Sequence, residues 1–419
     1  MPISRHSKVL GQAEPRRKHS AAEILVQTPN IARALFDAER RLFWLKTTVA
    51  LAFAVGIVLS SPLWVGPRSY PLVPVVGELA LPALVEAVLF AALFPLAALI
   101  AFSRKPRKFI AAFLTIVVIL CVFDVTRWQP WVYQYGFILA TLALFSWNSD
   151  DTDGQARTLN ILRLIVASTY VFSGLQKINS EFIETVFPEL VEPVTNVFPQ
   201  ATYPLYLLGM AAPLLQVAFG VGLLTKKFRR VSLIAAVSMH VFILAMVGPF
   251  GANWNTIIWP WTAAMAIFDL LLFGDRDTFS LREIFWTRRY PYHAAVLALF
   301  GVMPLLSFAN LWDSYLSAAL YSGNLTDAFI YTTDAGQKTL PEAVRPYTVR
   351  AGPDDNELDV QAWATRELNV PAYPEARVHK RIAKAVCDRM ADPTQLTLLI
   401  REHRLLFSSS EAKYLCAEL

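Results

Sequence analysis

The chain has 419 residues, of which 55% are hydrophobic and 17% are charged, and its mean hydropathy is +0.41. A soluble globular domain carries about 25% charged residues, so this composition excludes an ordinary soluble protein and indicates a membrane protein. The net charge of +5 does not indicate nucleic-acid binding, because the basic residues are concentrated in short loops between apolar stretches.

Residues 1–42 form a polar, basic segment ahead of the first apolar run. This segment is not a cleavable signal peptide, in which an apolar core follows the basic region at once. Residues 20–42 fit either an amphipathic helix that lies on the cytoplasmic membrane face or a disordered basic tail.

Residues 43–312 contain nine apolar stretches, which we interpret as nine membrane spans because a spanning helix needs about 20 mostly apolar residues. The predicted spans are Phe43–Leu63, Leu79–Phe102, Phe109–Val125, Val132–Trp147, Leu159–Gln176, Pro204–Leu224, Val231–Val247, Asn255–Phe273 and His293–Trp312.

The distribution of Lys and Arg predicts the orientation of these spans. Basic residues gather in the N-terminal segment and in the loops Ser103–Lys108, Thr225–Arg230 and Arg276–Arg289. With nine spans and a cytoplasmic N-terminus, all of these loops face the cytoplasm, as the positive-inside rule requires. The loop Asn179–Tyr203 lies on the opposite side and carries glutamates but no basic residue.

Residues 313–419 are polar and contain no further span. The runs Asp327–Thr332 and Gln395–Ile400 are typical of strands, and the apolar spacing over Glu375–Met390 is helical. The sequence therefore predicts an all-α polytopic membrane protein with about nine transmembrane helices and a small C-terminal α/β domain outside the cytoplasm.

Two of the three cysteines, Cys387 and Cys416, lie in this C-terminal domain. In an oxidising compartment they could form a disulfide, and the alternative is two separate buried thiols. Cys121 falls inside the third span, where it serves as a small apolar residue.

Lys177, at the end of the fifth span, is the strongest functional candidate. An ionisable side chain at membrane depth costs about 2.5–3.5 kcal/mol on insertion scales and usually faces a protein interior. The alternative is a lysine that extends to the lipid headgroups. Tyr170 and Ser173 share its helix face, since the three residues are spaced 3 and 4 apart. His240 in the seventh span is either a satisfied core histidine or a catalytic group.

The turn between the third and fourth spans is rich in polar and aromatic residues. We interpret Asp124 and Arg127 as a structural pair, and an aromatic belt at the membrane interface accounts for the tryptophans. The candidate substrate-binding residues in and beyond this turn are Gln129, Trp131, Tyr133, Tyr135 and, in the turn after the seventh span, Asn253.

The stretch Tyr170-Val-Phe-Ser-Gly-Leu-Gln-Lys-Ile-Asn179 resembles the Tyr-…-Gly-x-x-Lys-Leu motif of the vitamin K-dependent γ-carboxylase superfamily, also described as the horizontally transferred transmembrane domain family. The resemblance extends over roughly residues 35–312. It includes the polar-aromatic turn, the basic loop after the sixth span and a histidine in the next span. It implies nine spans, an outer-side domain and a bacterial member in the cytoplasmic (inner) membrane, with a periplasmic C-terminal domain.

In the carboxylases, the lysine that matches Lys177 is implicated in proton abstraction from a reduced quinone. The oxygenated quinone then gives a strong base that deprotonates a peptide glutamate, which takes up CO₂. This chain has Gln129 where the carboxylases carry an Asn-His pair, and Gln216 where related bacterial chains often carry a glutamate.

These observations lead to two main functional hypotheses. The first is an integral-membrane enzyme, either a carboxylase-like lyase or a quinone-dependent oxygenase, that acts on a lipid-soluble quinone or a peptide with Lys177 as base and His240 as a second catalytic group. Such a lysine needs its pKa lowered from about 10.4 toward about 7–8, which burial does. The second is a non-catalytic protein that matures, escorts or anchors a secreted peptide.

A third hypothesis, a transporter, is disfavoured because no internal repeat is visible. The expected partners are the lipid bilayer and a secreted peptide or protein, with no nucleic acid. A reduced quinone is the expected cofactor. No metal is predicted, since the six histidines are scattered along the chain.

Overall fold

The structure is a computed structural model that describes residues 37–77, 79–144, 147, 151–275, 279–285, 291–404 and 408–419. The predicted N-terminal segment therefore lies outside the described residues up to position 36. The same is true of positions 276–278 and 286–290 in the last basic loop.

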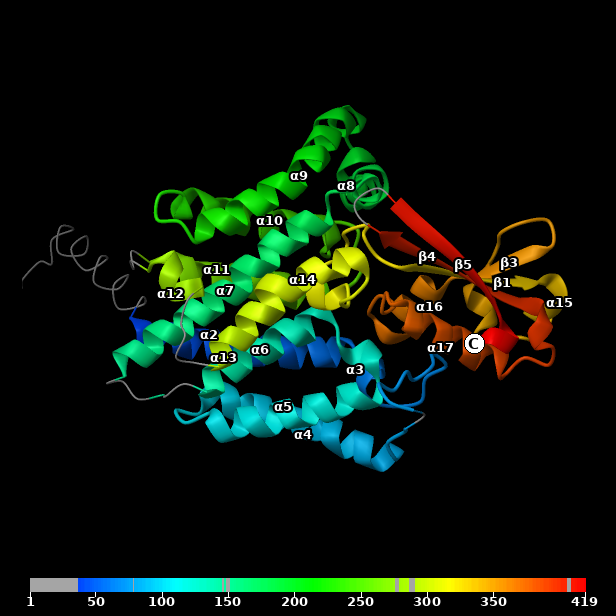
Figure 1. Cartoon of the computed structure of the whole chain (residues 1–419), viewed down its shortest axis with the longest axis horizontal. Helices are drawn as coiled ribbons and strands as arrows, with labels where there is room; N and C mark the ends of the chain where they lie inside the picture. The colour runs from blue at the N-terminus through cyan, green and yellow to red at the C-terminus, as the bar shows by residue number, and fades with distance from the viewer. Residues whose placement is uncertain are drawn as a thin grey trace, which may run out of the picture.

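Each of the predicted apolar stretches forms helix within the described residues, and these helices make up one bundle (Figure 1). Its long elements are α2 (Ala38–Leu59), α4 (Ala83–Phe102), α5 (Arg107–Phe123), α6 (Pro130–Leu144), α7 (Thr152–Gln176), α9 (Thr202–Leu223), α10 (Arg229–Val247), α11 (Ile258–Phe273) and the composite helix α13 (Pro291–Leu297), Ala298–Val302 and α14 (Met303–Leu306). Short helices between them are α3 (Ser61–Trp64), α8 (Phe187–Thr195) and α12 (Leu281–Phe285).

Six helices of the described chain are long and apolar enough to cross a membrane, judged by length and composition. They are α2, α4, α7, Pro199–Leu223 with α9, α10 and Pro291–Ala309 with α13 and α14. Three others are shorter, since α5 has 17 residues, α6 has 15 and α11 has 16. A membrane-spanning protein is therefore supported, while the count of nine spans stays a prediction.

The two ends of the bundle differ in chemistry. Near the start of α2, the Lys46 ammonium donates to the carbonyl of Ser103 at 2.6 Å, directly after α4. In the same helix, Arg41 pairs with Asp275, just beyond α11, at 3.1 Å. The turn between α9 and α10 is drawn at this end too, and the sheet domain lies at the other (Figure 1). The described basic turns thus share the end that lies away from the C-terminal domain.

Helix α7 is the central helix of the bundle. In its apolar span 78% of the residues are buried, against 17% for the outer helix α4. Gly174 allows α9 to approach closely, because a Cβ there would lie 2.7 Å from the carbonyl oxygen of Pro213. The C-terminal end of α7 therefore packs directly against α9.

Residues beyond the bundle form an antiparallel sheet with strand order β2-β3-β1-β4-β5. Its elements are β1 (Asp327–Thr333), α15 (Asp334–Thr339), β2 (Thr348–Arg350), β3 (Asp355–Leu358), α16 (Val360–Leu368), α17 (Ala376–Cys387), β4 (Leu396–Arg404) and β5 (Ser408–Leu415). The predicted small sheet domain is confirmed, and its strands β1 and β4 and helix α17 fall where the sequence patterns place them. Alternate strand residues such as Ile330 and Leu398 are buried, and so is Ile382 of α17, so one face of the sheet forms the domain core.

Cys387 at the end of α17 and Cys416 directly after β5 form a disulfide, with their Cα atoms 5.9 Å apart. This bond ties the helical layer to the edge of the sheet. Cys121 is buried in α5 as a free thiol.

The C-terminal domain is hydrogen-bonded to the segment that follows α3. The carboxylate of Glu367 in α16 accepts hydrogen bonds from the Ser69 hydroxyl at 2.5 Å and from the Tyr70 backbone N–H at 3.1 Å. The Asn369 amide donates to the carbonyl of Leu59 at the end of α2, at 2.8 Å. Polar contacts thus fix the domain against the bundle end to which Lys177 belongs.

Candidate functional site

A cavity of about 1110 Å³ lies between α7, α9, α10, α11 and the segment 318–321. Its walls are mostly apolar, and its volume slightly exceeds the roughly 300–1,000 Å³ that ligand pockets occupy. Two wall residues on α9 and α10, Leu215 and Val231, are 53% and 70% exposed. The cavity is therefore open on the side where these helices face outward, which is the lipid side of a membrane-embedded bundle.

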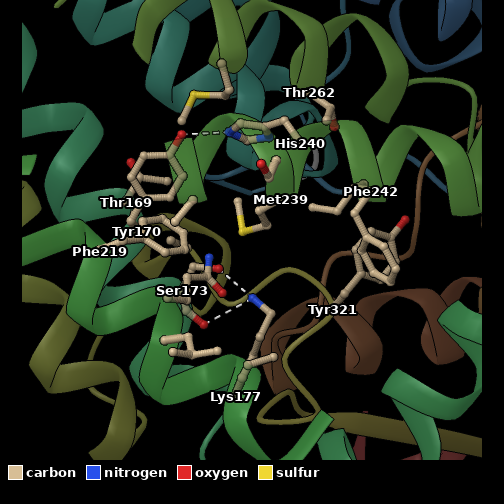
Figure 2. Close-up of a pocket in the computed structure, with 18 of the residues that line it drawn as sticks. Thr169, Tyr170, Ser173, Lys177, Phe219, Met239, His240, Phe242, Thr262 and Tyr321 are labelled. Carbon is tan, nitrogen blue, oxygen red and sulfur yellow. Dashed lines mark hydrogen bonds between the residues drawn. The ribbon is translucent and has the colours of Figure 1, made fainter. Parts of the chain in front are cut away.

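Lys177 follows the last residue of α7, and its side chain turns back along that helix into the cavity wall (Figure 2). Its ammonium donates to the Ser173 hydroxyl at 2.5 Å and to the Ser173 carbonyl at 3.1 Å. The i, i+4 spacing that predicted this shared helix face also produces the contact. In the described part of the chain, no carboxylate forms an ion pair with this amine.

A second polar group is buried deeper in the bundle. The Tyr170 hydroxyl donates to Asp269 of α11 at 2.6 Å and lies 2.6 Å from Nε2 of His240 in α10. With the hydroxyl donating its single proton to the carboxylate, Nε2 of His240 is assigned as the donor to the Tyr170 oxygen. Nδ1 is then an acceptor, and it has no hydrogen-bond partner among the described residues.

Figure 2 shows how these two groups share the cavity. Lys177 and Ser173 lie at one end, Tyr170 and His240 lie at the other, and Met239 is between them. The arrangement offers a primary amine and a buried Tyr–Asp–His hydrogen-bond cluster to a ligand long enough to extend past Met239.

Lys177, Ser173, Tyr170 and His240 therefore line one cavity. The candidate substrate-binding residues of the aromatic turn, by contrast, do not line this cavity. Trp131 and Tyr135 pack in the core against Phe53, with ring centroids 5.5 and 5.6 Å apart. They are four residues apart on α6, so they share one helix face, and this face packs on α2.

The other residues of this turn are also outside the cavity wall. The Gln129 amide is buried and donates to the carbonyl of Thr126 at 2.9 Å, so it closes the turn that precedes α6. Tyr133 stacks on Phe300 with ring centroids 5.0 Å apart. Neither residue lines the Lys177 cavity.

Asn253 is a further correction. It is exposed in the turn after α10, where its φ of 50° lies in the left-handed region that asparagine tolerates. The cavity wall instead contains its neighbour Trp254, whose ring meets Tyr321 with centroids 5.4 Å apart.

Asp124 and Arg127 are structural, but they are not primarily partners of each other. Their nearest charged atoms are 3.9 Å apart, whereas Asp124 lies 2.5 Å from Arg68 and Arg127 pairs with Glu86. The predicted pair is thus a four-residue charge network, in which both partners come from segments that the turn itself does not contain.

Sequence reasoning missed Asp269 and Tyr321. Asp269 was detectable, because it is the one charged residue in the apolar run Ile258–Phe273 and such residues usually have a function or a partner. Tyr321 gave no signal, since it lies in the polar connection to the sheet domain. Gln216, one of the polar residues noted in the sequence, lines the cavity from α9.

Among the described residues, no group of three or more His, Cys, Asp or Glu side chains could hold a metal ion. Comparison with protein-family models, curated proteins and solved structures finds no match to this chain. The functional argument therefore rests on the cavity and its polar groups.

Proposed function

We propose that this chain is an integral-membrane enzyme, similar to the γ-carboxylase-like superfamily, that acts on a lipid-soluble quinone with Lys177 as its base. The observation that carries the proposal is the Lys177 amine in the wall of a large apolar cavity, held by Ser173 and by no carboxylate of the described chain. An amine in such surroundings favours its neutral form, which is the form that accepts a proton.

The cavity residues fit a quinone ring with an apolar tail. Phe219, Phe242 and Tyr321 offer aromatic side chains against which a flat ring can pack, and α9 and α10 contribute apolar wall residues, of which Leu215 and Val231 are exposed. A quinone of this kind would supply redox chemistry. The chain's own contribution is to position the ring, exclude water and take up a proton at Lys177 Nζ, with His240 and Tyr170 as a second proton-exchanging group.

The topology belongs to the same proposal. Nine spans with a cytoplasmic N-terminus would place the sheet domain in the periplasm of a bacterial cytoplasmic membrane, at the end of the bundle that carries Lys177. The gathering of the described basic turns at the opposite end supports this orientation. A peptide substrate would then approach the cavity from the periplasm, beside the sheet domain.

Two substitutions test the base. Purified protein in lipid vesicles is given a reduced prenylated naphthoquinone, and oxygen uptake is recorded. Lys177→Met should be inactive, because it keeps the apolar stem and removes the amine. Lys177→Arg should also be inactive, because a guanidinium does not deprotonate near neutral pH. Lys226, exposed in the turn between α9 and α10, provides the matched control, and Lys226→Met should keep full activity.

A fully active Lys177→Arg variant would overturn the base assignment, since a lysine that extends to the headgroups needs only its charge. Thermal stability of each variant is measured in parallel. Inactivity then counts only where the protein remains as stable as the wild type within about 1 kcal/mol.

A second candidate, an escort for a secreted peptide, is favoured by the outer face of the sheet. Phe329 and Tyr331 of β1 lie on the face opposite the domain core, with their rings stacked at a centroid distance of 6.4 Å and only partly covered. An escort needs the fold and this face, so secretion of its client should survive Lys177→Met and fail with Phe329→Ser.

A further inference from the structure

A second cavity, of about 330 Å³, lies where the bundle meets the sheet domain. Its walls come from the segment after α3, the first turn of α4, the 3-10 turn Val125–Arg127 and the residues around the end of α17. Three arginines and one glutamate line it, namely Arg68, Arg127, Arg389 and Glu86. It is separate from the Lys177 cavity and has no wall residue in common with it.

Arg127 is already satisfied by the fold. Its guanidinium donates to the carbonyls of Leu63 and Leu120, both at 2.9 Å, and to that of Trp64 at 3.2 Å, and it pairs with Glu86. Arg127 therefore has a structural role. It adds positive electrostatic potential to the cavity, but its N–H groups are already bonded within the protein.

Arg68 is not satisfied. Its side chain is only 5% exposed, and its Nη groups donate to Asp124 at 2.5 Å and to two backbone carbonyls. Its Nε is buried and has no hydrogen-bond acceptor in the part of the chain that the structure describes. A buried donor without an acceptor costs about 1–3 kcal/mol, so an acceptor supplied from outside would be bound favourably.

Arg389 supplies a second guanidinium from the sheet domain. It is exposed, and its guanidinium donates to the Ser69 carbonyl at 3.3 Å. Among the described residues, no carboxylate pairs with it. Arg68 is paired with Asp124, and Arg127 is paired with Glu86. The positive charge of Arg389 is therefore not neutralised by a carboxylate of the described residues. The N-terminus of α4, at Ala83, adds the positive end of a 20-residue helix beside the same wall.

We propose that this cavity binds a phosphate group, held by the guanidinium of Arg389 and attracted by the Arg68 side chain in the cavity wall, whose Nε has no acceptor in the described chain. Guanidinium groups match phosphate oxygens in geometry and charge, and the cavity has room for a phosphate with a short substituent. Two sources share this chemistry, inorganic phosphate and the headgroup of an anionic phospholipid. The cavity lies at the ends of apolar helices, which is the depth at which headgroup phosphates lie in a bilayer.

Arg389→Gln tests the proposal, because this exposed change leaves the buried network intact. Arg366→Gln, at an exposed position of α16, is the matched control for loss of one positive charge. Each full-length protein is purified in detergent. Phosphatidylglycerol retained by the protein is counted by native mass spectrometry, and thermal stability is titrated with sodium phosphate against sodium chloride at equal ionic strength.

Phosphatidylglycerol that is retained by the wild type and the control, but roughly tenfold more weakly by Arg389→Gln, supports a lipid source. A phosphate-dependent rise in melting temperature that Arg389→Gln loses supports free phosphate. The proposal is overturned if neither probe binds the wild type, or if Arg389→Gln binds both as the wild type does.

Discussion

Glu375, directly before α17, should make the outer domain less stable as the pH rises. Its carboxylate accepts the Ser314 backbone N–H at 2.7 Å and lies 3.6 Å from Arg377. Arg377 is held more closely by Asp313, at 2.5 Å. Burial, together with the nearby Asp313 charge, raises the pKa of Glu375 from 4.5 to about 7.

The sign follows from proton counts. Between pH 4.5 and about 7 the folded domain keeps a proton on Glu375 that the unfolded chain has released, so stability falls through this window as the pH rises. At about 1.4 kcal/mol per pH unit the full effect is about 3 kcal/mol. Since the side chain is 16% exposed, solvent screening reduces the expected loss to about 1–3 kcal/mol.

His379 on the same helix acts in the opposite direction. Burial lowers its pKa from 6.5 to about 4, so between these values the unfolded chain binds a proton that the folded domain does not. Its contribution to stability is complete above pH 6.5 and is lost as the pH falls toward 4. The two effects oppose each other below pH 6.5, and the loss caused by Glu375 stands alone around pH 7.

Glu375→Gln keeps an acceptor for Ser314 and removes the charge. We expect the variant to match the wild type at pH 5 and to be more stable by about 1–3 kcal/mol at pH 8, a rise of a few degrees in melting temperature. Thermal unfolding followed by intrinsic tryptophan fluorescence, to which the buried Trp363 of this domain contributes, measures this across pH 4–8. A variant with the unchanged wild-type pH profile, or one destabilised at pH 8, would refute the reasoning.

Two further predictions concern topology and the disulfide. With a membrane-impermeant thiol reagent on intact cells, a cysteine introduced at Asp355 should be labelled and one introduced at Lys226 should not; the reverse pattern would contradict the proposed orientation. Mass spectrometry of the non-reduced protein should find Cys387 and Cys416 in one linked peptide pair, and their loop of about 30 residues should stabilise the domain by roughly 3–4 kcal/mol in the chain-entropy model. Two alkylatable thiols in the native protein would exclude the bond.

The helices and the small sheet were predictable because each depends on local patterns. Apolar stretches specify the bundle helices, and the aromatic and β-branched run Asp327–Thr332 is typical of a strand, which here pairs on both sides. Helix α7 begins at Thr152, seven residues before the predicted span, because Asp151 caps it by accepting the Gly154 N–H at 2.9 Å. An apolar pattern cannot locate such a polar start.

The site was predictable along one helix and not between helices. Spacing alone placed Tyr170, Ser173 and Lys177 on one face of α7. It could not show that Trp131 turns toward α2, since that depends on how α6 is rotated in the bundle. Asp269 meets Tyr170 across 99 residues of sequence, a contact that no local pattern encodes.

The central claim is that the Lys177 cavity holds a lipid-soluble quinone, and photolabelling tests it most directly. A photoreactive naphthoquinone with a prenyl tail is irradiated with the protein in lipid vesicles, and the labelled peptides are mapped by mass spectrometry. We predict label on α9 and α10 around Phe219 and Phe242 that excess unlabelled quinone removes. Helix α4, of which only 17% is buried, reports on non-specific labelling from the lipid. Label on the cavity helices that is no stronger than on α4, or that excess quinone leaves unchanged, would contradict the account.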